Sequence, residues 1–210
     1  MGQAESLAQS LQADMPRLTL QRIGEAAMRN ARSNAADGRS IADLPPIGAG
    51  DKAIVVAAGP SLHKHHIAEQ LADFDGAIIA TDSALRYLLS HKITPDLVVT
   101  LDTHDKRIVR WFGDPALCED DLADDYFSRQ DMDPHTNELH RNEEIVRLLD
   151  LHGKGIPIAL ATTSHPSVVA RAKQIGMACY WWNPMLDDPD RSGLTQALLD
   201  MNGMPAVNAG

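Results

Sequence analysis

The sequence predicts an α/β protein with a Rossmann-like, open and mostly parallel sheet, and three observations support this fold class. Short runs rich in Val, Ile and Ala recur from Lys52 onward, with helical patterns between them. These runs lack polar alternation, which is typical of strands covered on both faces. Polar residues follow the runs directly, at the place where open parallel sheets bind ligands. We therefore expect helices on both faces of the sheet.

The apolar runs give the predicted strands and the stretches between them give the predicted helices. The strands are AIVVAA at 53–58, AIIAT at 77–81, LVVTL at 97–101, PIALA at 157–161 and MACYWW at 177–182. The connecting helical patterns lie at about 61–72, 83–91 and 165–175. Strand, helix and strand thus alternate as in βαβ units.

Residues 1–50 are expected to precede the sheet as a helical N-terminal segment and a linker. The first 34 residues are rich in Ala, Gln, Leu and Arg, with apolar residues at helical spacing. Residues 34–51 concentrate Gly, Pro, Asp and Ser, which break helical and strand periodicity. We expect a domain edge there, so that residues 51–210 form the sheet domain.

Charge and composition exclude several classes of partner. The 19 Lys and Arg and the 29 Asp and Glu give a net charge of −10, which repels nucleic acid and anionic lipid surfaces. No apolar run approaches the ~20 residues that span a bilayer, and the N-terminus has no basic start followed by an apolar stretch. We therefore expect a cytoplasmic protein with no membrane span. The two cysteines, Cys118 and Cys179, belong to no CxxC pattern and predict neither a disulfide framework nor a zinc site.

An acidic insertion is expected at about 113–137. Eight of the residues between Asp114 and Asp133 are Asp or Glu, and Arg129 is the single base among them. Such a segment is typical of a solvated insertion. A lid over the strand ends is the alternative, because a long loop inside a domain is often functional.

The turn after the first predicted strand is a candidate anion site. Gly59 has no Cβ, so a phosphate can approach its backbone, and Pro60 suits the first turn of a helix. Ser61 can cap that helix or donate its hydroxyl, and Leu62 follows it. The N-terminal end of a helix favours an anion. A plain strand-to-helix turn is the alternative.

Polar side chains follow the next strands as well. Asp82, with Ser83 beside it, and Asp102 stand where carboxylates of open sheets hold a ribose hydroxyl or Mg²⁺. Helix capping is the alternative for both carboxylates. His165 ends another strand and is a candidate acid or base, or else an ordinary helix-start residue before Pro166.

The aromatic run at the fifth strand, Tyr180 to Trp182, can stack on a base or pterin ring or fill the core. The chain contains no GxxxxGK[ST], GxGxxG, HExxH or GxSxG motif. A P-loop kinase and a standard NAD dehydrogenase are therefore not indicated.

Together, VVAAGPSL at 55–62 and AIIATDSALRYLLSHKITPDLVVTLD at 77–102 resemble the MptE-like family. This family includes archaeal 6-hydroxymethylpterin diphosphokinases and the central domain of Maf flagellin glycosyltransferases. Its order of motifs is a strand ending in GPSL, a strand ending near an Asp before an Ala-Leu helix, then I-x-PD and a strand ending in Asp. The family usually continues beyond the position of Gly210 into further strands, so a chain incomplete at its C-terminus is expected.

For the pterin enzymes the resemblance implies Mg-ATP and pyrophosphoryl transfer to a hydroxymethyl group. For the Maf proteins it implies transfer of a nonulosonic sugar from a cytidine nucleotide (a CMP-sugar) to flagellin. A non-catalytic nucleotide-binding module is a third alternative. We expect Gly59–Leu62 to hold the donor phosphates, Asp82 to contact ribose or metal, Asp102 to bind Mg²⁺, and His165 to act as acid or base. Ser83 is expected to help bind the nucleotide donor.

Overall fold

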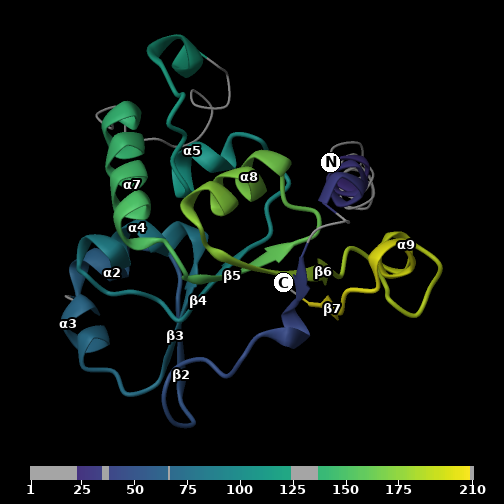
Figure 1. Cartoon of the computed structure of the whole chain (residues 1–210), viewed down its shortest axis with the longest axis horizontal. Helices are drawn as coiled ribbons and strands as arrows, with labels where there is room; N and C mark the ends of the chain where they lie inside the picture. Colours follow the sequence, from purple (N-terminus) through teal and green to yellow (C-terminus); the bar gives the residue numbers. More distant parts are fainter. Residues whose placement is uncertain (1–22, 35–37, 66, 124–136, 209–210) are drawn as a thin grey trace, which may run out of the picture.

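A computed structural model describes residues 23–34, 38–65, 67–123 and 137–208. Its centre is a parallel sheet with the strand order β1-β6-β5-β4-β3-β2, and β7 pairs in parallel with β6 (Figure 1). The predicted α/β class and open parallel sheet are confirmed. No helix in these described ranges is long and apolar enough to cross a membrane.

All five predicted strands are present. They are β2 (Ala53–Val56), β3 (Ala77–Thr81), β4 (Leu97–Thr100), β5 (Pro157–Ala161) and β6 (Ala178–Pro184). Two strands of two residues each, β1 (Arg39–Ser40) and β7 (Ala206–Val207), were not predicted because they are too short to show a period. β1 lies within the expected linker, and the domain edge near residue 50 stays a prediction.

The helices between the strands cover one face of the sheet. They are α2 (Pro60–Lys64), α3 (Ile67–Ala72), α4 (Asp82–Ser90), α5 (Arg107–Trp111), α7 (Glu138–His152) and α8 (Pro166–Ile175). One row of paired residues crosses five strands and packs toward these helices: Val56, Ala80, Val98, Ile158 and Cys179. The connections from β2 to β6 all step in the same direction, and right-handed crossovers of that kind place their helices on one side.

The second face of the sheet has a different cover. The short 3-10 helix η1 (Ile41–Asp43) and the residues after it bring Ile41, Leu44 and Ile47 against Leu97 and Trp182. The helices therefore pack around the sheet unevenly, and η1 with the loop after it packs on this second face. A pocket remains beside that cover, as described below.

The PD motif at Pro95–Asp96 has a structural role in joining β3 to β4. The Ile78 amide donates to Asp96 Oδ2 at 2.8 Å, and the Asp96 amide donates to the Ile78 carbonyl at 2.8 Å. Asp96 therefore extends the β3–β4 pairing to the residue before β4 begins. Both strands then end at the same edge of the sheet, where Asp82 and Asp102 lie.

The N-terminal helix, residues 23–34 of the described chain, is fixed to the strand ends by two asparagines. Asn30 donates to the carbonyls of Thr103 and Thr163, at 3.2 and 3.0 Å, and Asn34 donates to the carbonyls of Thr162 and Ser164, at 2.9 and 2.7 Å. Both asparagines are buried, as they must be to satisfy these carbonyls away from water. The predicted helical N-terminal segment is present here, and its first 22 residues lie outside the described ranges.

A buried amide joins β5 and β6 to the C-terminal part of the chain, which carries α9 (Leu194–Asn202). Asn183 is fully buried; its Oδ1 accepts from Thr162 Oγ1 at 2.7 Å, and its Nδ2 donates to Asn202 Oδ1 and the Met204 carbonyl, both at 2.9 Å. A buried polar group contributes to stability only while its partners are present.

We expect Asn183→Ala to lower the free energy of unfolding by about 2–3 kcal/mol, because it leaves several buried polar groups without partners. The melting temperature should fall by roughly 4–12 °C in a chain of this size, measured by thermal unfolding. Asp200→Ala, at an exposed position of α9, is the control and should change stability by less than about 0.5 kcal/mol. Equal melting of both variants would show that the amide network contributes little.

Candidate functional site

The Gly59 turn leads directly from β2 into α2, as predicted. Gly59 precedes the helix in an extended conformation, Pro60 is its first residue, and the Leu62 amide donates to the Gly59 carbonyl at 3.1 Å. Leu62 is buried among the side chains under α4, while Ser61 is exposed. A Cβ built on Gly59 would meet only Ser61 Oγ, at 3.7 Å. The backbone at Gly59 therefore faces open space that a ligand can enter.

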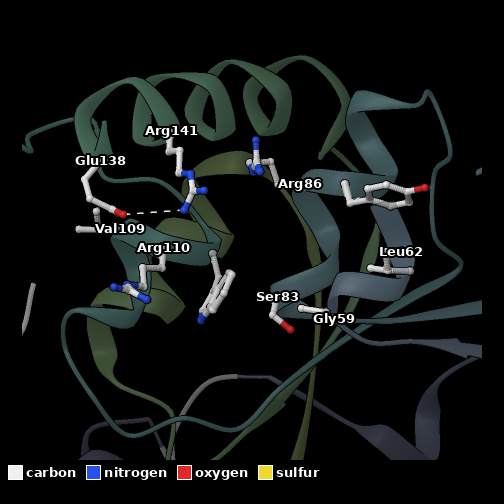
Figure 2. Close-up of a pocket in the computed structure, with 11 residues that line it drawn as sticks. Gly59, Leu62, Ser83, Arg86, Val109, Arg110, Glu138 and Arg141 are labelled. Atoms are coloured by element: carbon white, nitrogen blue, oxygen red, sulfur yellow. Dashed lines mark ion pairs between the residues drawn. The ribbon is translucent and has the colours of Figure 1, made fainter. Parts of the chain in front are cut away.

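That space is a pocket of about 220 Å³ between the turn and three helices, which we call the arginine pocket. It is lined by Ala58, Gly59, Leu62, Ser83, Arg86, Tyr87, Val109, Arg110, Trp111, Glu138 and Arg141. Figure 2 shows Arg86 of α4 and Arg141 of α7 on one side of the opening, with Gly59 and Ser83 across from them. The arrangement brings three arginines to the predicted phosphate turn.

Two of these arginines have acidic neighbours on α7. Arg86 Nη1 lies 2.6 Å from Glu144 Oε2, and both side chains are partly exposed. Arg141 Nη1 lies 3.9 Å from Glu138 Oε1, too far for a hydrogen bond. The lining of the pocket carries three arginines and one glutamate, so it is locally positive in a chain with a net charge of −10. An anion is the ligand that this charge favours.

Sequence reasoning missed these three arginines. They come from α4, α5 and α7, which contact one another over the end of the sheet. Each arginine sits in an ordinary amphipathic pattern, and no spacing in the sequence links them. Only the packing of the three helices brings them together.

Asp82 is the first residue of α4, and its carboxylate faces the neighbouring strand. It is 4% exposed, Oδ2 accepts from Thr100 Oγ1 at 2.7 Å, and Oδ1 accepts from the Ser83 amide at 2.7 Å. Asp82 thus links the ends of β3 and β4. Its predicted contact with ribose or metal is not tested by these bonds and stays a prediction.

Ser83 lies between two cavities. Its hydroxyl is 2.9 Å from Thr81 Oγ1, and it lines both the arginine pocket and a second pocket on the η1 face of the sheet. The second pocket, which we call the apolar pocket, measures about 480 Å³. Its lining is Ile41, Ala57, Ala58, Thr81, Asp82, Ser83, Leu97, Val99, Leu101, Ala159, Trp182, Val207 and Asn208. Trp182 of the predicted aromatic run thus borders a cavity, while Trp181 is buried in the core.

Asp102 and His165 are neighbours at the ends of β4 and β5. The His165 amide donates to the Asp102 carbonyl at 3.3 Å, and Asp102 Oδ1 accepts from the His104 amide at 2.8 Å. His165 caps α8 by accepting from the Ser167 amide, and its Nδ1 lies 2.8 Å from Ser167 Oγ. Neither Asp102 nor His165 lines the arginine pocket.

Burial lowers the pKa of His165 below its usual 6.5; Asp105 opposes this shift and His104 adds to it. The imidazole is therefore neutral at pH 7 and can accept a proton. Among the residues that the structure describes, no group of three or more His, Cys, Asp or Glu side chains is arranged to hold a metal ion. Mg²⁺ needs fewer protein ligands than that, because it binds through one or two carboxylates together with substrate phosphates and water.

The expected acidic insertion at about 113–137 is described only in part. Residues Glu119–Ala123 form the 3-10 helix η2, and residues 124–136 lie outside the described ranges. The choice between a solvated insertion and a lid stays open.

Fold and site together define a class: an open parallel α/β protein with an arginine-lined pocket beside the first βα turn. Comparison with protein families then gives a match to the model described as 6-hydroxymethylpterin diphosphokinase MptE-like, over residues 25–111. No match was found among curated proteins or among solved structures. The resemblance to the MptE-like family is therefore confirmed for residues 25–111, from the N-terminal helix to the end of α5.

We expect acid to lower the stability of the His165→Asn variant less than that of the native protein. The folded protein holds the pKa of His165 below the unfolded value, so the unfolded chain binds the proton more readily. Stability should then fall as the pH drops through 6.5 toward the lowered pKa. His165→Asn keeps a residue that caps helices well but removes this titration. Melting temperatures of both proteins at pH 7.5 and 5.5 check it; equal losses would contradict it.

Proposed function

We propose that this chain is a nucleotide-dependent transferase that holds the phosphates of its donor in the arginine pocket. The most specific form of the proposal is transfer of a pyrophosphoryl group from ATP to a 6-hydroxymethylpterin-like acceptor. It is supported by the family match at residues 25–111, whose description is that of a diphosphokinase. The observation that carries it is that Arg86, Arg110 and Arg141 line one pocket together with Gly59.

Arginines suit a polyphosphate for physical reasons. A guanidinium stays charged at every working pH and presents several N–H donors to phosphate oxygens. Three guanidinium groups around one cavity can offset the repulsion among the charges of a triphosphate. Gly59 adds backbone that a phosphate can approach, because its Cβ position is open.

In the proposed reaction the acceptor hydroxyl oxygen attacks the β-phosphorus of ATP. A new P–O bond forms, the bond between that phosphorus and the bridging α–β oxygen breaks, and AMP leaves with the electron pair. The hydroxyl proton must pass to a base, and His165, neutral at pH 7, is our candidate. Bound Mg²⁺ would neutralise phosphate charge. Asp82 and Asp102 are our sequence-based candidates for contacts to ribose and metal.

We place the acceptor ring in the apolar pocket. That pocket is lined largely by aliphatic side chains and Trp182, which suit a flat ring, and its volume lies in the range of small-molecule sites. It shares Ala58 and Ser83 with the arginine pocket, so a hydroxymethyl group on the ring would face the phosphates across these two residues.

One observation favours the Maf-type alternative, in which a nonulosonic sugar moves from a CMP-sugar to flagellin. A helix precedes the sheet and is bonded into the strand ends through Asn30 and Asn34, and a helical segment before the sheet looks like the Maf arrangement. A sugar acid also carries a carboxylate that arginines bind. The nucleotide that binds separates the two hypotheses.

We expect ATP to raise the melting temperature of the protein, and Arg141→Gln to weaken ATP binding by about ten-fold or more, since hydrogen bonds to charged groups contribute about 1.5–3 kcal/mol. Arg147→Gln, at an exposed position of the same helix, is the matched control and should leave binding unchanged. Melting and calorimetric titration with ATP, ADP, CMP, CTP and UDP, each with and without Mg²⁺, give the measurement.

A ligand at 100 times its Kd should add about 2.7 kcal/mol of stability, which is easily seen as a melting shift. Preference for the cytidine nucleotides would favour the Maf-type alternative. Binding of a nucleotide without turnover of any donor would indicate a non-catalytic module. If no nucleotide binds, or if the two arginine variants behave alike, the proposed use of the arginine pocket is wrong.

The acceptor site is tested by filling the apolar pocket. Ala57 is exposed and lines this pocket, so Ala57→Trp should weaken binding of 6-hydroxymethylpterin by about ten-fold or more at little cost in stability. Val55→Trp is the control, because Val55 lies two residues earlier in β2, is 67% exposed and does not line the pocket. Pterin fluorescence measures both affinities. Equal affinities would exclude the apolar pocket as the acceptor site.

A further inference from the structure

Glu138 is the single carboxylate among the described residues that line the arginine pocket. It is the first residue of α7, directly after the cap residue Asn137, whose side chain accepts from the His140 amide. The start of the helix therefore holds Glu138 beside Arg141 at the entrance to the pocket (Figure 2). A carboxylate in a pocket that we assign to phosphates needs an explanation, because it repels them.

One carboxylate oxygen of Glu138 has no hydrogen bond from the described residues. The side chain is 11% exposed, and Oε1 is buried with no hydrogen-bond donor among the described residues. Arg141 Nη1 is 3.9 Å from Oε1, and the Arg141 side chain is half-exposed. A buried carboxylate oxygen without a hydrogen bond is costly, and such atoms are rare unless a ligand or an ion completes them.

Arg86 shows what a satisfied ion pair in the same region looks like. Its Nη1 lies 2.6 Å from Glu144 Oε2, within hydrogen-bond distance. Glu144 lies six residues after Glu138 in α7. Glu144 thus already serves as a structural partner for an arginine, whereas Glu138 lacks that geometry. Neutralising an arginine is therefore an insufficient account of Glu138.

A divalent cation fits these observations. Mg²⁺ takes oxygen ligands and is held by one or two carboxylates with substrate phosphates and water, so a single buried glutamate oxygen beside a phosphate pocket suffices. Neither of the two carboxylates expected to bind metal, Asp82 and Asp102, lines this pocket. The Asp82 carboxylate accepts from the Thr100 hydroxyl and the Ser83 amide. The Asp102 carboxylate accepts from the His104 amide.

We propose that Glu138 is the protein ligand of the divalent cation that accompanies the donor phosphates in the arginine pocket. The proposal rests on the proposed function, because it requires phosphates in that pocket. In this arrangement the arginines bind the outer phosphate oxygens, and the glutamate makes binding depend on the metal by repelling phosphates that arrive without one.

The test is calorimetric titration of the whole chain with inorganic pyrophosphate, with and without Mg²⁺. In the native protein Mg²⁺ should strengthen pyrophosphate binding by about ten-fold or more, or about 1.4 kcal/mol or more. In Glu138→Gln binding without metal should become tighter, since a like charge is gone, and the gain from Mg²⁺ should fall below about three-fold. Glu143→Gln, exposed on the same helix, should behave as the native protein does.

Asp102→Asn is measured beside these variants to test the alternative metal ligand, and Glu143→Gln remains the control. If Glu138→Gln keeps the gain, the inference is wrong, and loss of the gain in Asp102→Asn alone would return the metal to Asp102. If pyrophosphate binds in an Arg141-dependent way but Mg²⁺ has no effect on the native protein, only the inference about Glu138 fails. If pyrophosphate does not bind at all, the proposed use of the arginine pocket fails with it.

Discussion

The direction of the chain through the parallel sheet is the constraint on which the rest of the structure depends. From β2 to β6 each strand pairs with the next one along the chain, and every connection steps the same way. Right-handed crossovers then place α2 to α8 on one face, while all strands end at one edge. The helices crowd together above that edge, so α4, α5 and α7 meet beside the Gly59 turn and form the arginine pocket. On the opposite face η1 and its loop pack against the sheet, and the apolar pocket lies beside them.

Electrostatics explains why a positive cavity is stable in an acidic protein. Each arginine near the Gly59 turn would repel the others, and partly exposed side chains reduce that repulsion by staying in contact with water. Glu144 relieves it further by binding Arg86 directly. The net charge of the whole chain, −10, disfavours large polyanions, whereas the three arginines and one glutamate that line the pocket give it a local positive charge. The overall charge therefore bears on binding of large charged partners, and the local charge of the pocket bears on binding of small ligands.

The sequence predicted the strands and the turn well because both depend on local chemistry. Continuous Val, Ile and Ala runs identify buried strands, and Gly59–Pro60 after such a run suits a turn that opens a helix. Burial of Asp82 toward Thr100 was not predictable, since a carboxylate after a strand can face a ligand or a neighbouring strand with the same sequence pattern. The arginines were missed for a deeper reason. Their proximity depends on how three helices pack, and no residue pattern within one helix reports the position of another.

The arginine pocket and the apolar pocket share Ser83, so they lie on either side of this residue. Ser83 follows β3, and its hydroxyl is held by Thr81 on the η1 face while it also borders the arginine pocket on the helical face. In the proposed function, a group that passes from one ligand to the other would cross the edge of the sheet between β2 and β3, because Ala58 and Ser83 are common to the described lining of both pockets. The backbone there is fixed by the β2–β3 pairing and by the bond from Asp82 to Thr100. Transfer across a rigid strand edge needs little motion of the protein, so positioning of the two ligands, more than movement of catalytic groups, is what this architecture can contribute to the reaction.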